Sequence, residues 1–197
     1  MEKIKKFVIN IFYQSIKISK NKKSVKVLGL VSFSESIFFP IPPDIFLIPI
    51  VFAKKNQWFS IGVYCTIFSV LGGIVGYFLG YYFWDSIGNS IVKFYNAEEQ
   101  IDNLKFYFSK YGWLLIFLAG FTPIPYKVFT IGSGLLTFNF FTFLLCSFIS
   151  RGLRFITLAY LIKKYGEKGI LLVEKHFFKL MLLMFFVILS ISMVYYL

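Results

Sequence analysis

Five charged side chains stand inside long apolar stretches of this 197-residue sequence. Two are acids, Glu35 and Asp44, and three are bases, Lys127, Arg151 and Arg154. One charge near the centre of a bilayer costs about 3 kcal/mol on insertion scales. Buried separately, the five would be prohibitive, whereas around one polar cavity they can pair and hydrate. We therefore expect them to meet near the middle of the protein.

Two roles for these charges follow from their chemistry. In the first, they form a substrate-binding or proton-coupling site. Lysine and arginine would hold a phosphate or carboxylate, because guanidinium suits bidentate contact with such groups. Desolvation would favour the neutral form of Glu35 or Asp44, which could then exchange protons near neutral pH. In the second, the charges are structural ion pairs that lock the chain together, and the sequence leaves both roles open.

Two proline clusters lie beside these charges, 83 residues apart, at 38–44 and 121–127. At this offset Pro40 aligns with Pro123 and Asp44 with Lys127. Proline breaks helical hydrogen bonding, and broken backbone at membrane depth must be covered by protein or face a water-filled cavity. Matching interruptions in two halves are typical of transporters with internal repeats. The residues expected to shape the two tips are Pro40, Pro42, Pro43, Pro123, Pro125, Tyr126, Gly132 and Gly134.

The composition places these clusters in an integral membrane protein. The chain is 58% hydrophobic, 22% aromatic and only 15% charged, which excludes an ordinary soluble domain. Its net charge of +12 does not indicate nucleic-acid binding, because the lysines gather at the ends of apolar runs. They favour a role at the membrane surface and in setting topology.

The lengths of the apolar runs predict the elements that position the charges. A helix needs about 20 residues to cross a bilayer. The runs at 27–53 and 111–137 are each split into shorter arms, so we expect two re-entrant helical hairpins. The run at 58–83 is unbroken, the run at 138–162 is interrupted by Arg151 and Arg154, and both are expected to span. Tyr77 in the first aligns with Tyr160 in the second. Small residues in the first span, at Gly72, Gly73, Gly76 and Gly80, predict close helix contact.

The predicted fold is therefore an all-α integral membrane protein, with an inverted repeat of re-entrant hairpin plus transmembrane helix. Residues 1–26 form a basic amphipathic segment, 27–170 the membrane domain, and 171–197 an extra C-terminal transmembrane helix. Placing the N-terminus in the cytoplasm keeps the lysine-rich loops inside and the net-acidic segment 84–110 outside, as the positive-inside rule requires.

Three motifs resemble those of the DedA family, whose conserved unit is also called the VTT or SNARE-associated domain. They are Glu35-x8-Asp44 with Pro40-Ile41-Pro42-Pro43, the run from Gly120 to Lys127, and Gly132-Ser133-Gly134. Arg151-Gly152-Leu153-Arg154-Phe155 extends the likeness toward the YqaA-like subgroup, and the whole resemblance covers about residues 25–170. It implies two opposed re-entrant hairpins, a bacterial inner-membrane location, and proton-driven movement of lipid or lipid-linked phosphate.

The resemblance also suggests roles for single residues. The membrane-embedded acids of the family correspond to Glu35 and Asp44, and its arginine after the second tip corresponds to Lys127. An arginine that precedes this tip in the family is replaced by Phe121. We expect Arg151 and Arg154 to supply the missing charge from the next span.

The leading functional hypothesis is a flippase or scramblase that moves a phospholipid or lipid-linked phosphate. One alternative is a proton-coupled exporter of small cations or drugs, with Glu35 and Asp44 binding the cargo, and another is a structural membrane assembly factor. An enzyme is not expected, because the sequence has no histidine-rich metal set, nucleophile elbow or phosphate-binding glycine loop. We expect no cofactor, no metal and no nucleic-acid partner. The expected partners are membrane lipids and protons, with a second copy of the chain left open.

Overall fold

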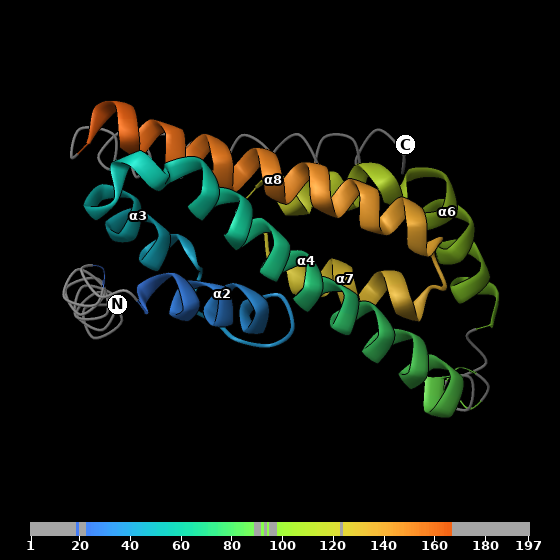
Figure 1. Ribbon diagram of the computed structural model, residues 1–197. Coiled ribbons are helices and arrows are strands. Elements are labelled where there is room, and N and C mark those ends of the chain that lie inside the picture. Colours follow the sequence, from blue (N-terminus) through green and yellow to red (C-terminus); the bar gives the residue numbers. More distant parts are fainter. Residues whose placement is uncertain are drawn as a thin grey trace, which may run out of the picture.

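The computed structural model describes residues 19, 23–88, 92, 94, 98–122 and 124–166. Within these ranges the chain is helical and contains no strand, as expected for an all-α protein (Figure 1). The predictions for most of 1–26, for 171–197 and for Pro123 lie outside the described residues.

The first half begins with two short helices joined by the first proline cluster. Helix α2 (Ser24–Glu35) ends at a turn in which the backbone N–H groups of residues 37, 38 and 39 all donate to Ser34 O. Helix α3 (Asp44–Ala53) starts directly after Pro43. Proline cannot continue a helix but suits its start, and an acid in the first turn complements the helix dipole. The acids Glu35 and Asp44 thus flank the turn.

Helix α4 (Trp58–Phe83) follows the short 3-10 helix η1 (Lys55–Gln57) and coincides with the range expected for the first span. It continues into the π-helical turn η2 (Trp84–Gly88). Among the described helices, two are long and apolar enough to cross a membrane by length and composition, Lys55–Phe83 and Phe140–Tyr165.

The second half has a similar order, with two helices joined by the second proline cluster and then a long helix. These are α6 (Glu98–Phe121), α7 (Tyr126–Leu135) and α8 (Phe140–Tyr165). Helix α6 is unbroken, so the polar segment before residue 110 and the first arm of the second broken run share one helix. Helix α8 is capped by Asn139, whose side chain accepts a hydrogen bond of 2.9 Å from Thr142 N.

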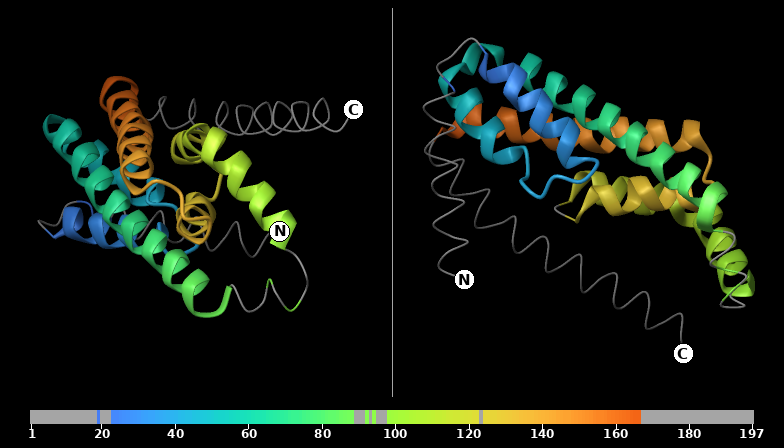
Figure 2. Two further views of the ribbon diagram at one scale, coloured as in Figure 1. Left: turned by 90° about the vertical axis from the view of Figure 1, so that its right-hand side faces the viewer. Right: turned by 90° about the horizontal axis from the view of Figure 1, so that it is seen from below.

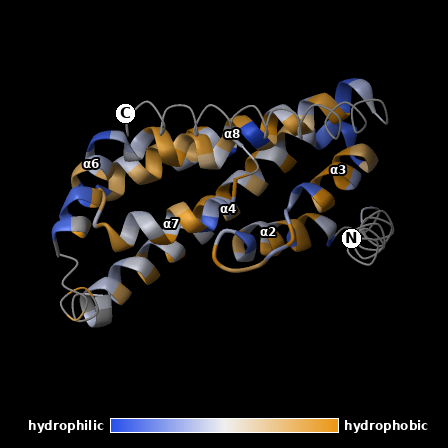
Figure 3. Ribbon diagram, turned by 180° about the vertical axis from the view of Figure 1, so that it is seen from behind, coloured by the Kyte–Doolittle hydropathy of each residue, from blue (hydrophilic) through white to orange (hydrophobic). Residues whose placement is uncertain are grey.

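The long helices α4 and α8 pack side by side and form the frame of the molecule (Figures 1 and 2). The α2–α3 pair lies toward one end of this frame and the α6–α7 pair toward the other, with their connecting turns near the middle. Helix α7 of the second half packs along α4 of the first half, and α3 of the first half packs along α8 of the second half. Coloured by hydropathy, the helices are largely apolar, with hydrophilic colour near the two ends and midway along α8 (Figure 3).

Glycines allow α4 to approach its neighbours at backbone distance. A Cβ atom at Gly72 would lie 2.2 Å from Phe33 O on α2, and one at Gly80 would lie 2.0 Å from Ile131 O on α7. The close helix contact predicted for this stripe is confirmed. From the α7 side, a Cβ at Gly134 would lie 1.8 Å from Tyr77 O, whereas Gly132 has nothing within 4 Å. Both of these glycines lie in the last turns of α7, away from its proline-bearing start.

Two apolar clusters hold the frame together. One gathers residues of α3, α4 and α8, including Leu47, Ile61 and Phe155. The other contains Tyr77, Ile116, Phe138 and Phe143. On α8, the charged residues Arg151 and Arg154 lie between Phe143 of the second cluster and Phe155 of the first.

Candidate functional site

All five charged residues singled out from the sequence line one cavity of about 300 Å³. It lies where the two proline-bearing turns meet against α8. The remaining lining residues come from the turns themselves and are Phe39, Pro40, Pro42, Pro43, Thr122, Ile124 and Pro125. The fold thus brings the two acids together with bases that lie at least 83 positions further along the chain.

The first ion pair joins α8 to α2. Arg151 Nη2 donates to Glu35 Oε2 at 2.7 Å, and Arg151 Nε donates to Ser69 Oγ on α4 at 2.6 Å. The guanidinium carbon lies 4.6 Å from the ring centre of Tyr126 and 4.8 Å from that of Phe155. Such a position over an aromatic ring is favourable for a cation. Arg151 is therefore held by hydrogen bonds and by ring contacts from four helices.

The second ion pair joins α8 to the start of α3. Arg154 Nη2 bonds to Asp44 Oδ2, and Arg154 Nη1 donates to Thr122 O at 2.6 Å. One arginine therefore links both proline-bearing turns. Arg151 and Arg154 are three positions apart, so they project from one face of α8, as the sequence predicts.

Lys127 links the turns in a different way. Its Nζ atom donates to Phe38 O and Phe39 O, each at 3.2 Å. Within the described part of the chain it has no carboxylate within ion-pair distance. The cavity thus contains three cations and two carboxylates, and each carboxylate is bonded to an arginine.

Hydroxyl groups that the sequence analysis did not single out complete the site. Ser69 Oγ lies 2.9 Å from Ser36 Oγ, and Thr130 Oγ1 donates to Ser36 O at 3.3 Å. Ser36 directly follows α2, and Ser69 and Thr130 lie in the apolar helices α4 and α7, where the sequence does not show which partner a hydroxyl group faces. The Tyr126 hydroxyl is buried near Ser147, but neither oxygen makes a hydrogen bond of standard geometry.

Two helices begin at the cavity. Asp44 opens α3 and Tyr126 opens α7, each helix is 10 residues long, and neither first turn is capped by a side chain. The N-terminal N–H groups of a helix carry partial positive charge and favour anions. Among the residues that the structure describes, no three His, Cys, Asp or Glu side chains gather as a metal site.

The model for the VTT domain matches residues 39–164 of this chain. The chain belongs to the VTT-domain family, the DedA family of membrane proteins. The matched range holds Asp44, Lys127, Arg151 and Arg154, and it begins just after Glu35.

Relatives of this VTT-domain protein occur in bacteria and archaea. An uncharacterised protein of Haemophilus influenzae is 42% identical over 76% of this chain and 78% of its own length. One of Histophilus somni is 41% identical over 72% of this chain and 73% of its own. One of Methanocaldococcus jannaschii is 32% identical over 64% of this chain and 75% of its own. No solved structure matches the chain.

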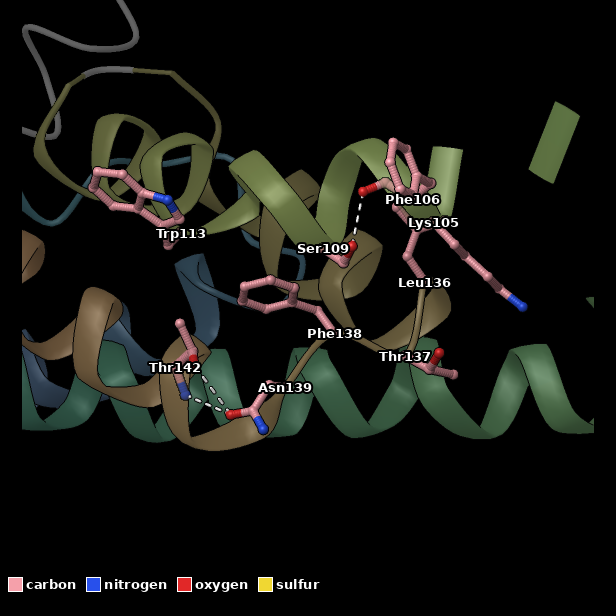
Figure 4. Close-up of a pocket in the computed structure, with 9 residues that line it drawn as sticks. All are labelled: Lys105, Phe106, Ser109, Trp113, Leu136, Thr137, Phe138, Asn139 and Thr142. Carbon is pink, nitrogen blue, oxygen red and sulfur yellow. Dashed lines mark hydrogen bonds between the residues drawn. The ribbon is translucent and has the colours of Figure 1, made fainter. Parts of the chain in front are cut away.

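A second groove of the VTT domain, of about 420 Å³, lies where α6 faces the turn between α7 and α8 (Figure 4). The Asn139 side-chain oxygen Oδ1 already caps α8, and the Ser109 hydroxyl donates to Phe106 O at 2.7 Å. The Lys105 ammonium lies 4.4 Å from the Trp84 ring centre. Because these polar groups are engaged locally, the charged cavity is the stronger candidate site.

Proposed function

We propose that this VTT-domain protein is a flippase- or scramblase-type transporter in the bacterial inner membrane. Its cargo would be an amphiphile with a phosphate in the headgroup, either a phospholipid or a lipid-linked phosphate. The observation that carries the proposal is the balance of charge in the cavity. Both carboxylates are already bonded to arginines, and among the described residues Lys127 is bonded only to backbone carbonyls. This balance favours an anionic group over a cationic cargo.

The proposal includes the arrangement of the chain in the bilayer. Helices α4 and α8 cross, the α2–α3 hairpin enters and leaves from the cytoplasmic side, and the α6–α7 hairpin does so from the opposite side. This inverted repeat is supported by the central meeting of the two turns and by the exchange of α3 and α7 between the halves. Helices of 12 and 10 residues are too short to cross alone. The N-terminus is cytoplasmic, and residues 171–197 add a further spanning helix.

In this arrangement the headgroup and the acyl chains take different paths. The phosphate enters the cavity and bonds to Arg154 and Lys127, while the chains stay in the surrounding bilayer. Exposed apolar residues at the tips suit such a path, since Phe38 is 69% exposed and Val128 is 61% exposed. Asp44 would exchange protons as the headgroup binds and leaves, which would couple movement to a proton gradient.

Purified protein in liposomes tests the function directly. We expect fluorescent phospholipid to move between leaflets when the wild-type chain is present. Asp44→Asn and Lys127→Ala should abolish the movement while the protein still inserts, and Gly132→Ala serves as a control because Gly132 contacts nothing within 4 Å. Solute movement driven by a pH gradient would instead indicate the exporter, and movement of neither cargo would indicate an assembly factor. Full activity in both cavity variants would remove the site assignment.

Cysteine labelling tests the topology. In a background with Cys65→Ala and Cys146→Ala, we introduce Lys54→Cys in one protein and Asp102→Cys in another. A membrane-impermeant maleimide added to intact spheroplasts should label position 102 and should reach position 54 only after the membrane is opened. Labelling with the two sides exchanged would contradict the opposed hairpins.

A further inference from the structure

The two ion pairs of the cavity differ in how completely their members are satisfied. Arg151 is only 3% exposed and contacts Glu35, Ser69 and two aromatic rings. Ser69 is itself anchored to Ser36 at the end of α2. These contacts hold the guanidinium in place beside Glu35 and favour a fixed pair.

Asp44 lacks such support on one of its oxygens. Its Oδ2 atom bonds to Arg154, but its Oδ1 atom is buried and accepts no hydrogen bond from the described residues. A buried acceptor left without a donor is unfavourable. The nearby Lys127 ammonium is held by two neutral carbonyls at 3.2 Å, the long end of the range for such bonds. This side of the cavity therefore has a carboxylate with one unbonded oxygen and a cation that has no anionic partner among the described residues.

We propose that Asp44 is an internal competitor for the substrate, whereas the Glu35–Arg151 pair is a fixed structural link. The Asp44 carboxylate occupies, on Arg154, the place that a phosphate oxygen of the substrate takes. When the phosphate binds, Arg154 exchanges one anionic acceptor for another, and Lys127 leaves the carbonyls of Phe38 and Phe39 for a charged partner. The return of Asp44 to Arg154 expels the phosphate. The inference rests on the proposed function only in taking a phosphate group as the ligand.

Neutralising the two acids should then have different effects, although both changes convert a carboxylate to an amide in the same cavity. Asp44→Asn removes the competitor and should tighten phosphate binding. It should also block transport, because nothing then displaces the bound headgroup. Glu35→Gln leaves the phosphate contacts in place and weakens a link between α2 and α8. It should lower the melting temperature and leave the affinity unchanged.

Isothermal titration calorimetry on the full chain in maltoside detergent tests this difference. The probes are dihexanoyl phosphatidate, inorganic phosphate, and dihexanoylglycerol as the control without phosphate. We expect Asp44→Asn to tighten binding of phosphatidate about tenfold, the size of one charge-assisted hydrogen bond, and Lys127→Ala to weaken it. Phosphatidate binding well above that of inorganic phosphate would identify a lipid headgroup as the ligand, and equal binding would identify free phosphate. If Glu35→Gln does not fold, Ser69→Ala loosens Arg151 in its place and should leave the affinity unchanged.

Unchanged or weaker binding by Asp44→Asn would overturn the competitor role. Equal tightening by Glu35→Gln or Ser69→Ala would also overturn it, because the two pairs would then be equivalent. Failure of the proposed function looks different. In that case the predicted pattern of affinities would appear, but no lipid would move in liposomes.

Discussion

The two halves of the protein supply opposite charges to the cavity. The first half, α2 to α4, carries both carboxylates, and the second half, α6 to α8, carries all three cations. Both ion pairs therefore cross from one half to the other. At the 83-residue offset that aligns the proline clusters, Glu35 aligns with Leu118, and Arg151 aligns with Phe68. The halves are thus alike in the order of their helices and different in their chemistry.

The opposite charges of the two halves explain how the halves are held in position against each other. Identical halves would bring like charges to the shared cavity, which is unfavourable. With acids on one side and bases on the other, each charge is satisfied only when the two halves meet. Single and double variants can measure how far the halves depend on each other and how far they are equivalent.

Removing one member of the enclosed pair should have the largest effect. Arg151→Met leaves Glu35 in the cavity without its cation, and breaking a buried pair in this way costs about 3–5 kcal/mol. We expect a large fall in the thermal midpoint in detergent. The double variant Glu35→Gln/Arg151→Met should recover part of the loss, because no uncompensated charge remains. A double variant as unstable as the single one would show that packing around Arg151, and not charge, holds the halves.

Two glycines of α7 test the close contact between the halves. Gly134→Ala places a Cβ atom 1.8 Å from the Tyr77 carbonyl oxygen, which as a backbone atom cannot easily move aside. We expect a loss of about 3 kcal/mol, the upper end of the usual cost of overpacking. Gly132→Ala is the matched control, with open space around it, and should be neutral or slightly stabilising. Equal thermal midpoints for the two variants would contradict the backbone contact of α4 with α7.

Two tyrosines that align at the 83-residue offset test whether the proposed repeat extends to the surroundings of the side chains. Tyr77 is 5% exposed and donates to Phe138 O at 2.5 Å, whereas Tyr160 is 43% exposed and packs on Trp58. Tyr77→Phe leaves a carbonyl without its donor and should cost about 1–2 kcal/mol in chemical denaturation. Tyr160→Phe should change stability by less than about 0.5 kcal/mol. Similar losses in both would indicate that Tyr160 has an equally demanding role.

The turns that follow the two short helices also differ. Thr137 has φ 54°, in the left-handed region, while Lys54, at the aligned position, has φ −127°. A β-branched residue at positive φ costs about 1–2 kcal/mol, and glycine avoids most of this cost. Thr137→Gly should therefore raise the thermal midpoint slightly. Lys54→Gly should lower it, because it adds chain entropy and removes the hydrogen bond from Lys54 Nζ to Ser24 Oγ. Destabilisation by Thr137→Gly would show that the threonine side chain offsets its strain.

Much of the frame could be predicted from the sequence. The range of α4, the approximate range of α8 and an interruption at the first proline cluster follow from apolar run lengths and proline positions, which are local properties. The helix before that cluster ends at Glu35, earlier than its apolar run does. The convergence of five charges followed from the cost of burying each one alone. The continuity of α6 through residue 110 was not predicted, because a change from polar to apolar side chains does not by itself end a helix. Ser69 was missed because a serine in an apolar helix gives no sign of the partner it faces.

From the sequence alone it follows that the acids and bases must pair, because each lies within a long apolar run that keeps it away from water. Which acid bonds to which base depends on the tertiary structure. Asp44 and Lys127 occupy equivalent places at the two tips, yet Asp44 bonds to Arg154, and Lys127 bonds to backbone carbonyls. The reason is geometric. Spacing along one helix fixes which side chains share a face, but pairing across the cavity depends on how α8 is rotated and how closely the glycines let the helices approach.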